Sequence, residues 1–151
     1  MGTYNYAPGG GVQPSNLDTG KFVVLKRVMK AQDIIAYNAT LTAAAKITAG
    51  DVIEAIDVPA GFLVLMTAVK VSTAGTAGNT IDVGIGGATD AYQNGVDIVT
   101  LTAALQLVGD TYGWTTLQGK YFGTTDTIDV LYVADEIVGE FTLYAIGIML
   151  D

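Results

Sequence analysis

The chain has 151 residues, no cysteine, no histidine and a formal net charge of −8, and only 15% of its residues are charged. Without histidine it lacks the near-neutral imidazole of most acid–base catalysis, and without cysteine it lacks a thiolate nucleophile, a disulfide and the usual zinc cluster. An acidic chain repels nucleic-acid phosphates, so we expect no nucleic-acid partner. We also expect no catalytic residue, no metal and no cofactor, and the length suits one domain.

Residues 1–20 differ in composition from the rest of the chain. They contain Pro8, Pro14 and three consecutive glycines at 9–11, and they offer few aliphatic side chains for a core. We therefore predict an extended N-terminal arm over residues 1–20 and a single domain over residues 21–151. The first residues show neither the basic nor the apolar region of a secretory signal, so we expect synthesis in the cytoplasm.

Short β-type segments separated by turn residues follow from Lys21 onward. The predicted strands are 22–29, 33–37, 52–58, 62–72, 80–85, 127–133 and 141–150. Such a series predicts an all-β protein, an antiparallel β-sandwich. Helical periodicity is weak and is confined to residues 42–47 and 102–108. No apolar stretch reaches the roughly 20 residues of a membrane-spanning helix, so no membrane partner is expected.

Four of the seven cationic residues lie close together in the sequence, at Lys21, Lys26, Arg27 and Lys30. A loose basic cluster of this kind is either the solvated face of a strand or a site for an anion. The solvated face is the commoner case, and we expect it here.

Two of the predicted strands are apolar on both faces. In residues 62–71 one face carries Leu63, Leu65, Val69 and Val71, and the other carries Phe62, Val64, Met66 and Ala68. In residues 141–150, Phe141, Leu143 and Met149 lie opposite Tyr144, Ile146, Ile148 and Leu150. A two-layer sandwich buries one face of each sheet, so the second apolar face needs a cover. We favour another subunit; the alternative is the arm or residues 86–123.

Two glycine-rich or acidic segments are candidate binding sites. Residues 84–89 resemble a dinucleotide loop, but a threonine stands in place of the third glycine, which favours the end of a strand. Asp90, Asn94, Gly95 and Asp97 offer oxygens to calcium, but their spacing misses that of the EF-hand, which favours a solvated loop.

Carboxylates and aromatic residues give two further candidates. Glu54, Glu136 and Glu140, together with the aspartates, could form the carboxylate pair of a glycosidase, although acidic proteins contain such pairs by chance. Trp114, with Tyr112, Tyr121 and Phe122, could stack on a sugar. A lone tryptophan among glycine-rich turns more often caps a core or fills an interface.

Several segments are recognisable by their residue types and by their order along the chain. They are DVIEAIDVPAG at 51–61, the apolar strand that ends at Ser72, TIDVG at 80–84, GATDAYQNG at 87–95 and the closing strand at 139–150. Over residues 45–151 the chain resembles small virion structural proteins of tailed bacteriophages. The resemblance implies a jelly-roll or related β-sandwich that sits as a trimer on the outer capsid surface, where capsomers meet. It implies no catalytic residue, and it makes the arm through Gly20 the segment that ties the subunit to its neighbours or to the shell.

Composition and resemblance together predict a non-enzymatic, self-associating protein. We expect a capsid decoration or cement protein that binds the major capsid protein on the outer shell of a tailed phage and stabilises that shell. We expect a homotrimer on the virion surface, made in the host cytoplasm. The alternative is a carbohydrate- or receptor-binding β-sandwich of a phage fibre or spike, for which a glycan that shields Trp114 would be evidence.

Overall fold

Nine strands and one helix make up the part of the chain that the computed structural model describes, residues 3–5, 20–42, 45–100 and 119–150. In chain order they are β1 (Thr3–Asn5), β2 (Phe22–Lys30), α1 (Ala31–Thr42), β3 (Val52–Val58), β4 (Phe62–Thr73), β5 (Thr80–Ile85), β6 (Ala88–Asp97), β7 (Lys120–Phe122), β8 (Asp126–Tyr132) and β9 (Glu140–Met149). None of the described helical residues forms a helix long and apolar enough to cross a membrane.

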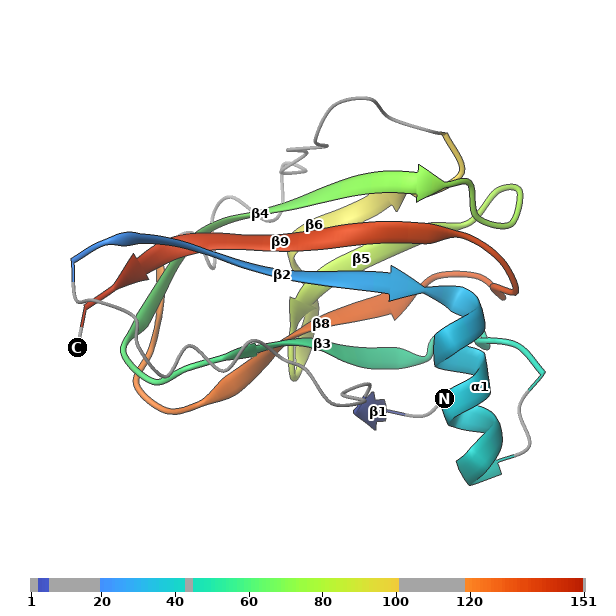
Figure 1. Ribbon diagram of the computed structural model, residues 1–151, viewed down its shortest axis with the longest axis horizontal. Helices are drawn as coiled ribbons and strands as arrows, with labels where there is room; N and C mark the ends of the chain where they lie inside the picture. The colour runs from blue at the N-terminus through green and yellow to red at the C-terminus, as the bar shows by residue number, and fades with distance from the viewer. Residues whose placement is uncertain (1–2, 6–19, 43–44, 101–118, 151) are drawn as a thin grey trace.

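The strands form two packed sheets (Figure 1). One sheet has five strands in the order β1-β3-β8-β5-β6, and the other has four in the order β2-β9-β4-β7. Apart from β1, which runs parallel to β3, all neighbouring strands are antiparallel. The all-β antiparallel sandwich predicted from the sequence is therefore confirmed.

Strand pairing from β2 to β9 is nested. The second strand pairs with the ninth, the third with the eighth, the fourth with the seventh and the fifth with the sixth. A chain folded back as a long double ribbon and wrapped over two sheets gives this order. We interpret it as the jelly-roll type expected above.

The core lies between the two sheets. It is formed by every second side chain of each strand, because the side chains of a strand alternate between its two faces. Ile53, Ile81 and Val130 point inward from the five-stranded sheet, and Met29 and Leu143 point inward from the other. Because successive side chains of a strand point to opposite faces, the residues between them lie on the outer faces. The turn at 59–61 joins β3 to β4, and Gly61 has the positive φ of 84° that a glycine tolerates there.

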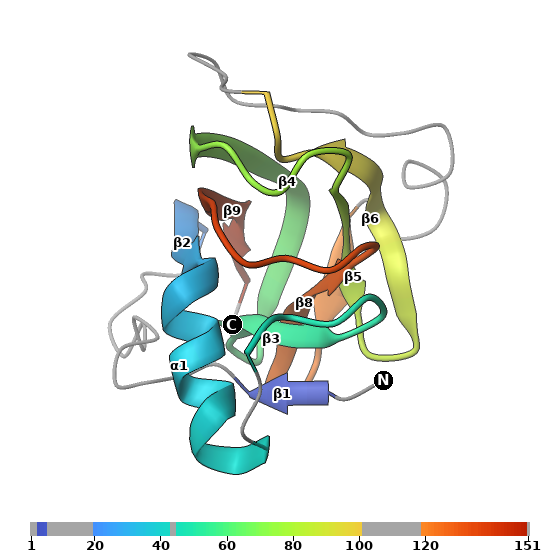
Figure 2. The same cartoon turned by 90° about the vertical axis from the view of Figure 1, so that its right-hand side faces the viewer.

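The strand predicted at 33–37 is wrong, because these residues belong to α1. Ala31, Ile34 and Asn38 are buried, and their spacing of three and four residues is that of one helix face. Five residues are too few to separate the two periods, and the tertiary structure decides. The N–H of Ala31 donates to the carbonyl oxygen of Gly139 at 3.0 Å where the helix begins. As Figure 2 shows, α1 lies at the end of the sandwich where β2 ends.

Two further predictions need correction. The solvated loop expected around Asp90–Asp97 belongs to strand β6, which pairs antiparallel with β5. The helical periodicity at 42–47 is also wrong at residues 45–47, which are not helical, and Ile47 forms an isolated bridge with Glu136. Residues 102–108 lie outside the described part of the chain.

Most of the predicted arm also lies outside the described residues. The structure describes Thr3–Asn5 and Gly20 of it, and places Thr3–Asn5 as β1 beside β3, with Tyr4 opposite Ile53. This part of the arm is the short edge strand of the five-stranded sheet of its own chain. The arm's role toward neighbouring molecules stays a prediction.

Candidate assembly surface

The outer face of the four-stranded sheet is the surface that the sequence singles out. Residues directly opposite each other on neighbouring strands share a face, so the strand register divides this face into rows. Across β2, β9 and β4 the rows are Phe22–Ile148–Leu63, Val24–Ile146–Met66, Lys26–Tyr144–Ala68, Val28–Thr142–Lys70 and Lys30–Glu140–Thr73. The rows change from wholly apolar at one end to charged at the other.

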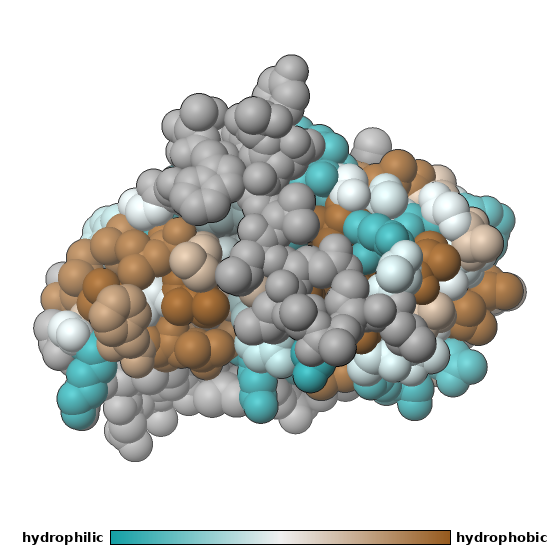
Figure 3. Space-filling model, turned by 90° about the horizontal axis from the view of Figure 1, so that it is seen from above, coloured by the Kyte–Doolittle hydropathy of each residue, from teal (hydrophilic) through white to brown (hydrophobic). Residues whose placement is uncertain are grey.

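The first two rows, with Tyr121 of β7 opposite Leu63, form what we call the apolar half: Phe22, Val24, Leu63, Met66, Tyr121, Ile146 and Ile148. Phe22 is 74% exposed, Val24 55% and Tyr121 43%. In Figure 3 apolar side chains gather at the left end of the molecule, where β4 begins and β9 ends in Figure 1. An exposed patch of this kind on a soluble protein commonly marks an interaction site.

The predicted double apolarity of 62–71 and 141–150 is thus confirmed, with one correction to the grouping. The pairing of β4 with β9 shifts register between Val64 and Met66, so Leu65 sits in a bulge. Beyond the bulge the alternation is displaced by one residue, which keeps Val69 in the core and leaves Met66 on the outer face. The grouping of 141–150 needs no such change.

The other three rows, with three lysines and one carboxylate, form what we call the cationic half: Lys26, Val28, Lys30, Ala68, Lys70, Thr73, Glu140, Thr142 and Tyr144. Lys30 lies 4.0 Å from Asp33 and opposite Glu140. Lys26 and Lys70 are exposed, and no described residue forms an ion pair with either. Of the basic residues expected near 21–30, Lys26 and Lys30 lie on this face, where Lys70, 40 residues after Lys30, joins them. Arg27 pairs with the core residue Leu143 and belongs to the opposite face of β2, and Lys21 precedes the strand.

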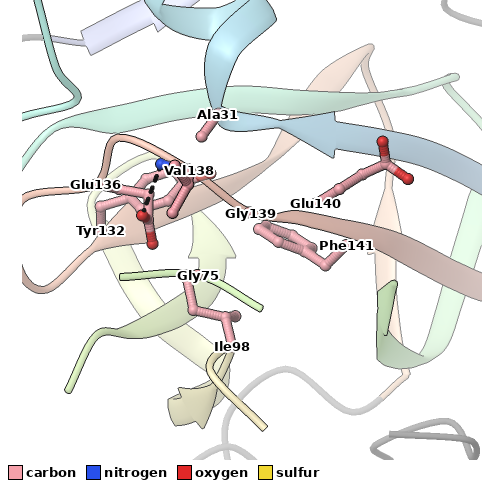
Figure 4. Close-up of a pocket in the computed structure, with 9 residues that line it drawn as sticks. All are labelled: Ala31, Gly75, Ile98, Tyr132, Glu136, Val138, Gly139, Glu140 and Phe141. Atoms are coloured by element: carbon pink, nitrogen blue, oxygen red, sulfur yellow. Dashed lines mark hydrogen bonds between the residues drawn. The ribbon is translucent and has the colours of Figure 1, made fainter. Parts of the chain in front are cut away.

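Glu136, one of the three candidate catalytic carboxylates, is buried at the junction of the two sheets. Its carboxylate accepts hydrogen bonds from the backbone N–H groups of Thr76, Ile137 and Val138, from the Thr76 hydroxyl and from the Asn79 side chain. Figure 4 shows the bond to Val138 inside a hollow that is too tight to hold a water molecule. All its acceptor positions serve the fold, which indicates a structural role.

The three glutamates do not converge on one site. Glu140 lies on the outer face of the four-stranded sheet, and in Figure 4 its carboxylate points away from Glu136. Glu54 lies on the five-stranded sheet, directly opposite Asp129. Asp129 is only 3% exposed, and this burial, with the nearby charges of Glu54 and Asp126, raises its pKa to about 6, although a hydrogen bond from Thr127 opposes the shift.

The Glu54–Asp129 pair is the arrangement that comes nearest to the carboxylate pair considered above. Neither residue lines the hollow of Figure 4 or the hollow beside Lys30. A glycosidase needs a cleft between its carboxylates for the sugar. Burial and the like charge of Glu54 act on Asp129, so the pair influences how stability depends on pH.

The candidate calcium and dinucleotide segments also belong to the five-stranded sheet. Residues 86–87 form the turn between β5 and β6, so the expected strand end is confirmed. Asp97 accepts hydrogen bonds from the N–H groups of Val99 and Thr100, and Asp82 accepts one from Gly95. Among the described residues no group of three or more carboxylates is placed to hold a metal ion.

The four aromatic residues considered for stacking on a sugar do not form one group among the described residues. Trp114 and Tyr112 lie outside the described residues. Phe122 is buried in the core, whereas Tyr121 belongs to the apolar half.

Comparisons with known proteins bear on the fold. No model of a protein family matches the chain, and no curated protein is similar to it in sequence. A chain of the cyanophage Pam1 capsid asymmetric unit is similar in structure, with a TM-score of 0.56 and 17% identity over 95% of this chain and 91% of that one. The chain shares its fold with phage capsid chains. A chain of the capsid of Ralstonia phage GP4 gives a TM-score of 0.50 and 13% identity over 89% of this chain and 88% of that one. The resemblance to phage virion structural proteins is confirmed at the level of the fold.

Proposed function

We propose that the chain is a non-enzymatic virion structural protein, a decoration or cement protein that binds the major capsid protein on the outer shell of a tailed phage and stabilises that shell. The two capsid chains with the same fold support this role. Synthesis in the host cytoplasm and attachment at the capsid surface belong to the proposal.

The observation that carries the proposal is the exposed apolar half. A sandwich that stays alone in water leaves Phe22, Val24 and Met66 exposed, at a free-energy cost of about 25 cal/mol for each Å² of apolar surface left uncovered. A structural protein present in many copies removes this cost when its copies pack together. The exposed apolar half is therefore better explained if the protein functions in an assembly than if it functions as a monomer.

A second copy of the chain is the occupant we propose for the apolar half. None of its seven side chains carries a charge, so copies with a net charge of −8 can meet there without burying ionised groups. Lys26 lies in the row next to the apolar half and Lys70 in the row after that, so neither lysine is among the residues of such a contact. Three apolar ends that converge on one axis give a closed trimer, the symmetry we expect.

Mass spectrometry of purified virions tests the proposal through presence and copy number. A decoration protein is present in a number close to that of the major capsid protein or a simple fraction of it, and shells lacking it break at lower temperature. Absence from the virion would contradict the virion role. A few copies that fractionate with the tail would instead support a fibre or spike module.

A further inference from the structure

Charge is segregated between the two sheets. The strands of the five-stranded sheet contain no lysine or arginine and seven carboxylates, Glu54, Asp57, Asp82, Asp90, Asp97, Asp126 and Asp129. The strands of the four-stranded sheet contain one carboxylate, Glu140, and five cations, Lys26, Arg27, Lys30, Lys70 and Lys120. A chain with a net charge of −8 thus presents one sheet of opposite sign.

The cationic half has the geometry of a docking surface. Lys26 and Lys70 are exposed on the two strands that flank β9, and Val28, 51% exposed, shares their face. A hollow of about 180 Å³ lies at the end of this half, lined by Lys30, Gln32, Thr73, Val138, Gly139 and Glu140. Two lysines without an ion-pair partner among the described residues, an apolar side chain and a hollow suit a surface that is itself acidic and partly apolar.

Other partners fit these observations less well. Nucleic acid carries a charge on every phosphate and would be repelled by the negative net charge of the whole chain. A second copy that used the same half would place Lys26 and Lys70 against their own equivalents, which like-charge repulsion disfavours. An acidic protein surface pairs with both lysines and can also cover the exposed apolar side chain of Val28 between them.

We propose that the cationic half, with Lys26 and Lys70 as its charged contacts, docks onto an acidic surface of the protein shell. This inference rests on the proposed function and assigns its shell-binding surface. It also replaces the expectation of a merely solvated basic face. Self-association through the apolar half and docking through the cationic half then use the two ends of one sheet.

Binding of the purified full chain to shells tests the proposal. The shells come from the encoding phage, grown without the gene for this chain. We expect Lys26→Gln and Lys70→Gln each to weaken binding about tenfold, since a lost charge-assisted contact of about 1.4 kcal/mol is a factor of ten. Raising the salt concentration from about 0.1 M to 1 M shortens the Debye length from about 10 Å to 3 Å and should weaken wild-type binding as well.

Lys46→Gln is the matched control, because Lys46 is an exposed lysine paired with Asp135, away from the outer face. It removes the same charge and should bind as the wild type does. Oligomer mass and melting temperature show that each variant is folded. Wild-type binding that neither lysine variant weakens would overturn this inference alone, whereas a wild type that never binds shells would overturn the proposed function itself.

Discussion

The side-chain amide of Asn79 donates a 3.0 Å hydrogen bond to Oε2 of Glu136, and both residues are 1% exposed. Asn79 also accepts a hydrogen bond from the N–H of Ala134. The pair thus ties the turn before β5 to the segment between β8 and β9. Since β8 and β9 belong to different sheets, this contact fixes how the two sheets join.

Glu136→Gln is expected to lower the free energy of unfolding by about 3 kcal/mol. The amide replaces one acceptor oxygen by a donor that faces other donors, and a buried group left unpaired costs about 1–3 kcal/mol. Urea denaturation at a fixed protein concentration measures the change. Glu140→Gln, on the outer face, serves as the control and should shift stability by about 0.5 kcal/mol or less. Equal stability of the two variants would contradict the structural role of Glu136.

Gly75→Ala tests how tightly the same junction is packed, because it adds a methyl group there. A Cβ atom at this position would lie 2.6 Å from Oε2 of Glu136 and 3.3 Å from Cδ1 of Ile98. We expect a loss of about 1–3 kcal/mol, typical of an overpacked site. Gly86→Ala is the matched control, because a Cβ there meets nothing within 4 Å. The idea fails if thermal unfolding shows both alanine variants equally stable.

Much of the fold follows from the sequence, since alternation and turn residues locate β3 and β5 at their observed ends. The sequence misses β6, because ATDAYQNGVD is rich in turn residues and becomes a strand by pairing with β5. It also misses the cationic half. Lys26 and Lys70 share a face only through the β2-β9-β4 order, which no local pattern contains.

Stability should depend on pH through Asp129. Its pKa is raised from 3.8 to about 6 in the folded chain, so between these values the folded state keeps a proton that the unfolded state has lost. The free energy of unfolding therefore falls as the pH rises from about 4 to 6, and levels off above. Asp129→Asn should remove this fall and stabilise the protein at pH 7. Chemical denaturation at several pH values measures both curves.

Asp135→Asn tests a carboxylate whose effect on the pH dependence of stability is opposite to that of Asp129. The hydrogen bonds from Lys46 and from the N–H of Ala49 hold the pKa of Asp135 below its usual value. This contribution to stability is present at neutral pH and is lost as the pH falls through the folded pKa. If the free energy of unfolding depended on pH in the same way for the Asp129 and Asp135 variants, the opposite pKa shifts given for these two residues would be refuted.

Deletion of residues 1–20 tests the arm. It removes β1, whose pairing with β3 spans three residue pairs at a sheet edge, so we expect the melting temperature to fall by about 4 °C or less. Binding to shells should be lost, because the resemblance assigns the arm to attachment. Circular dichroism on heating and shell sedimentation measure the two effects. A truncated chain that still binds shells normally would remove the arm from the attachment model.

The mass of the protein in solution tests self-association through the apolar half most directly. Light scattering of the full chain at tens of micromolar should give about three times the 15.7 kDa of one chain. Val24→Asp and Met66→Asp should reduce this mass to that of one chain, whereas Val133→Asp, at a residue 48% exposed outside the apolar half, should leave it unchanged. A wild type that remains at 15.7 kDa, or an oligomer that both aspartate variants of the apolar half leave intact, would contradict the account.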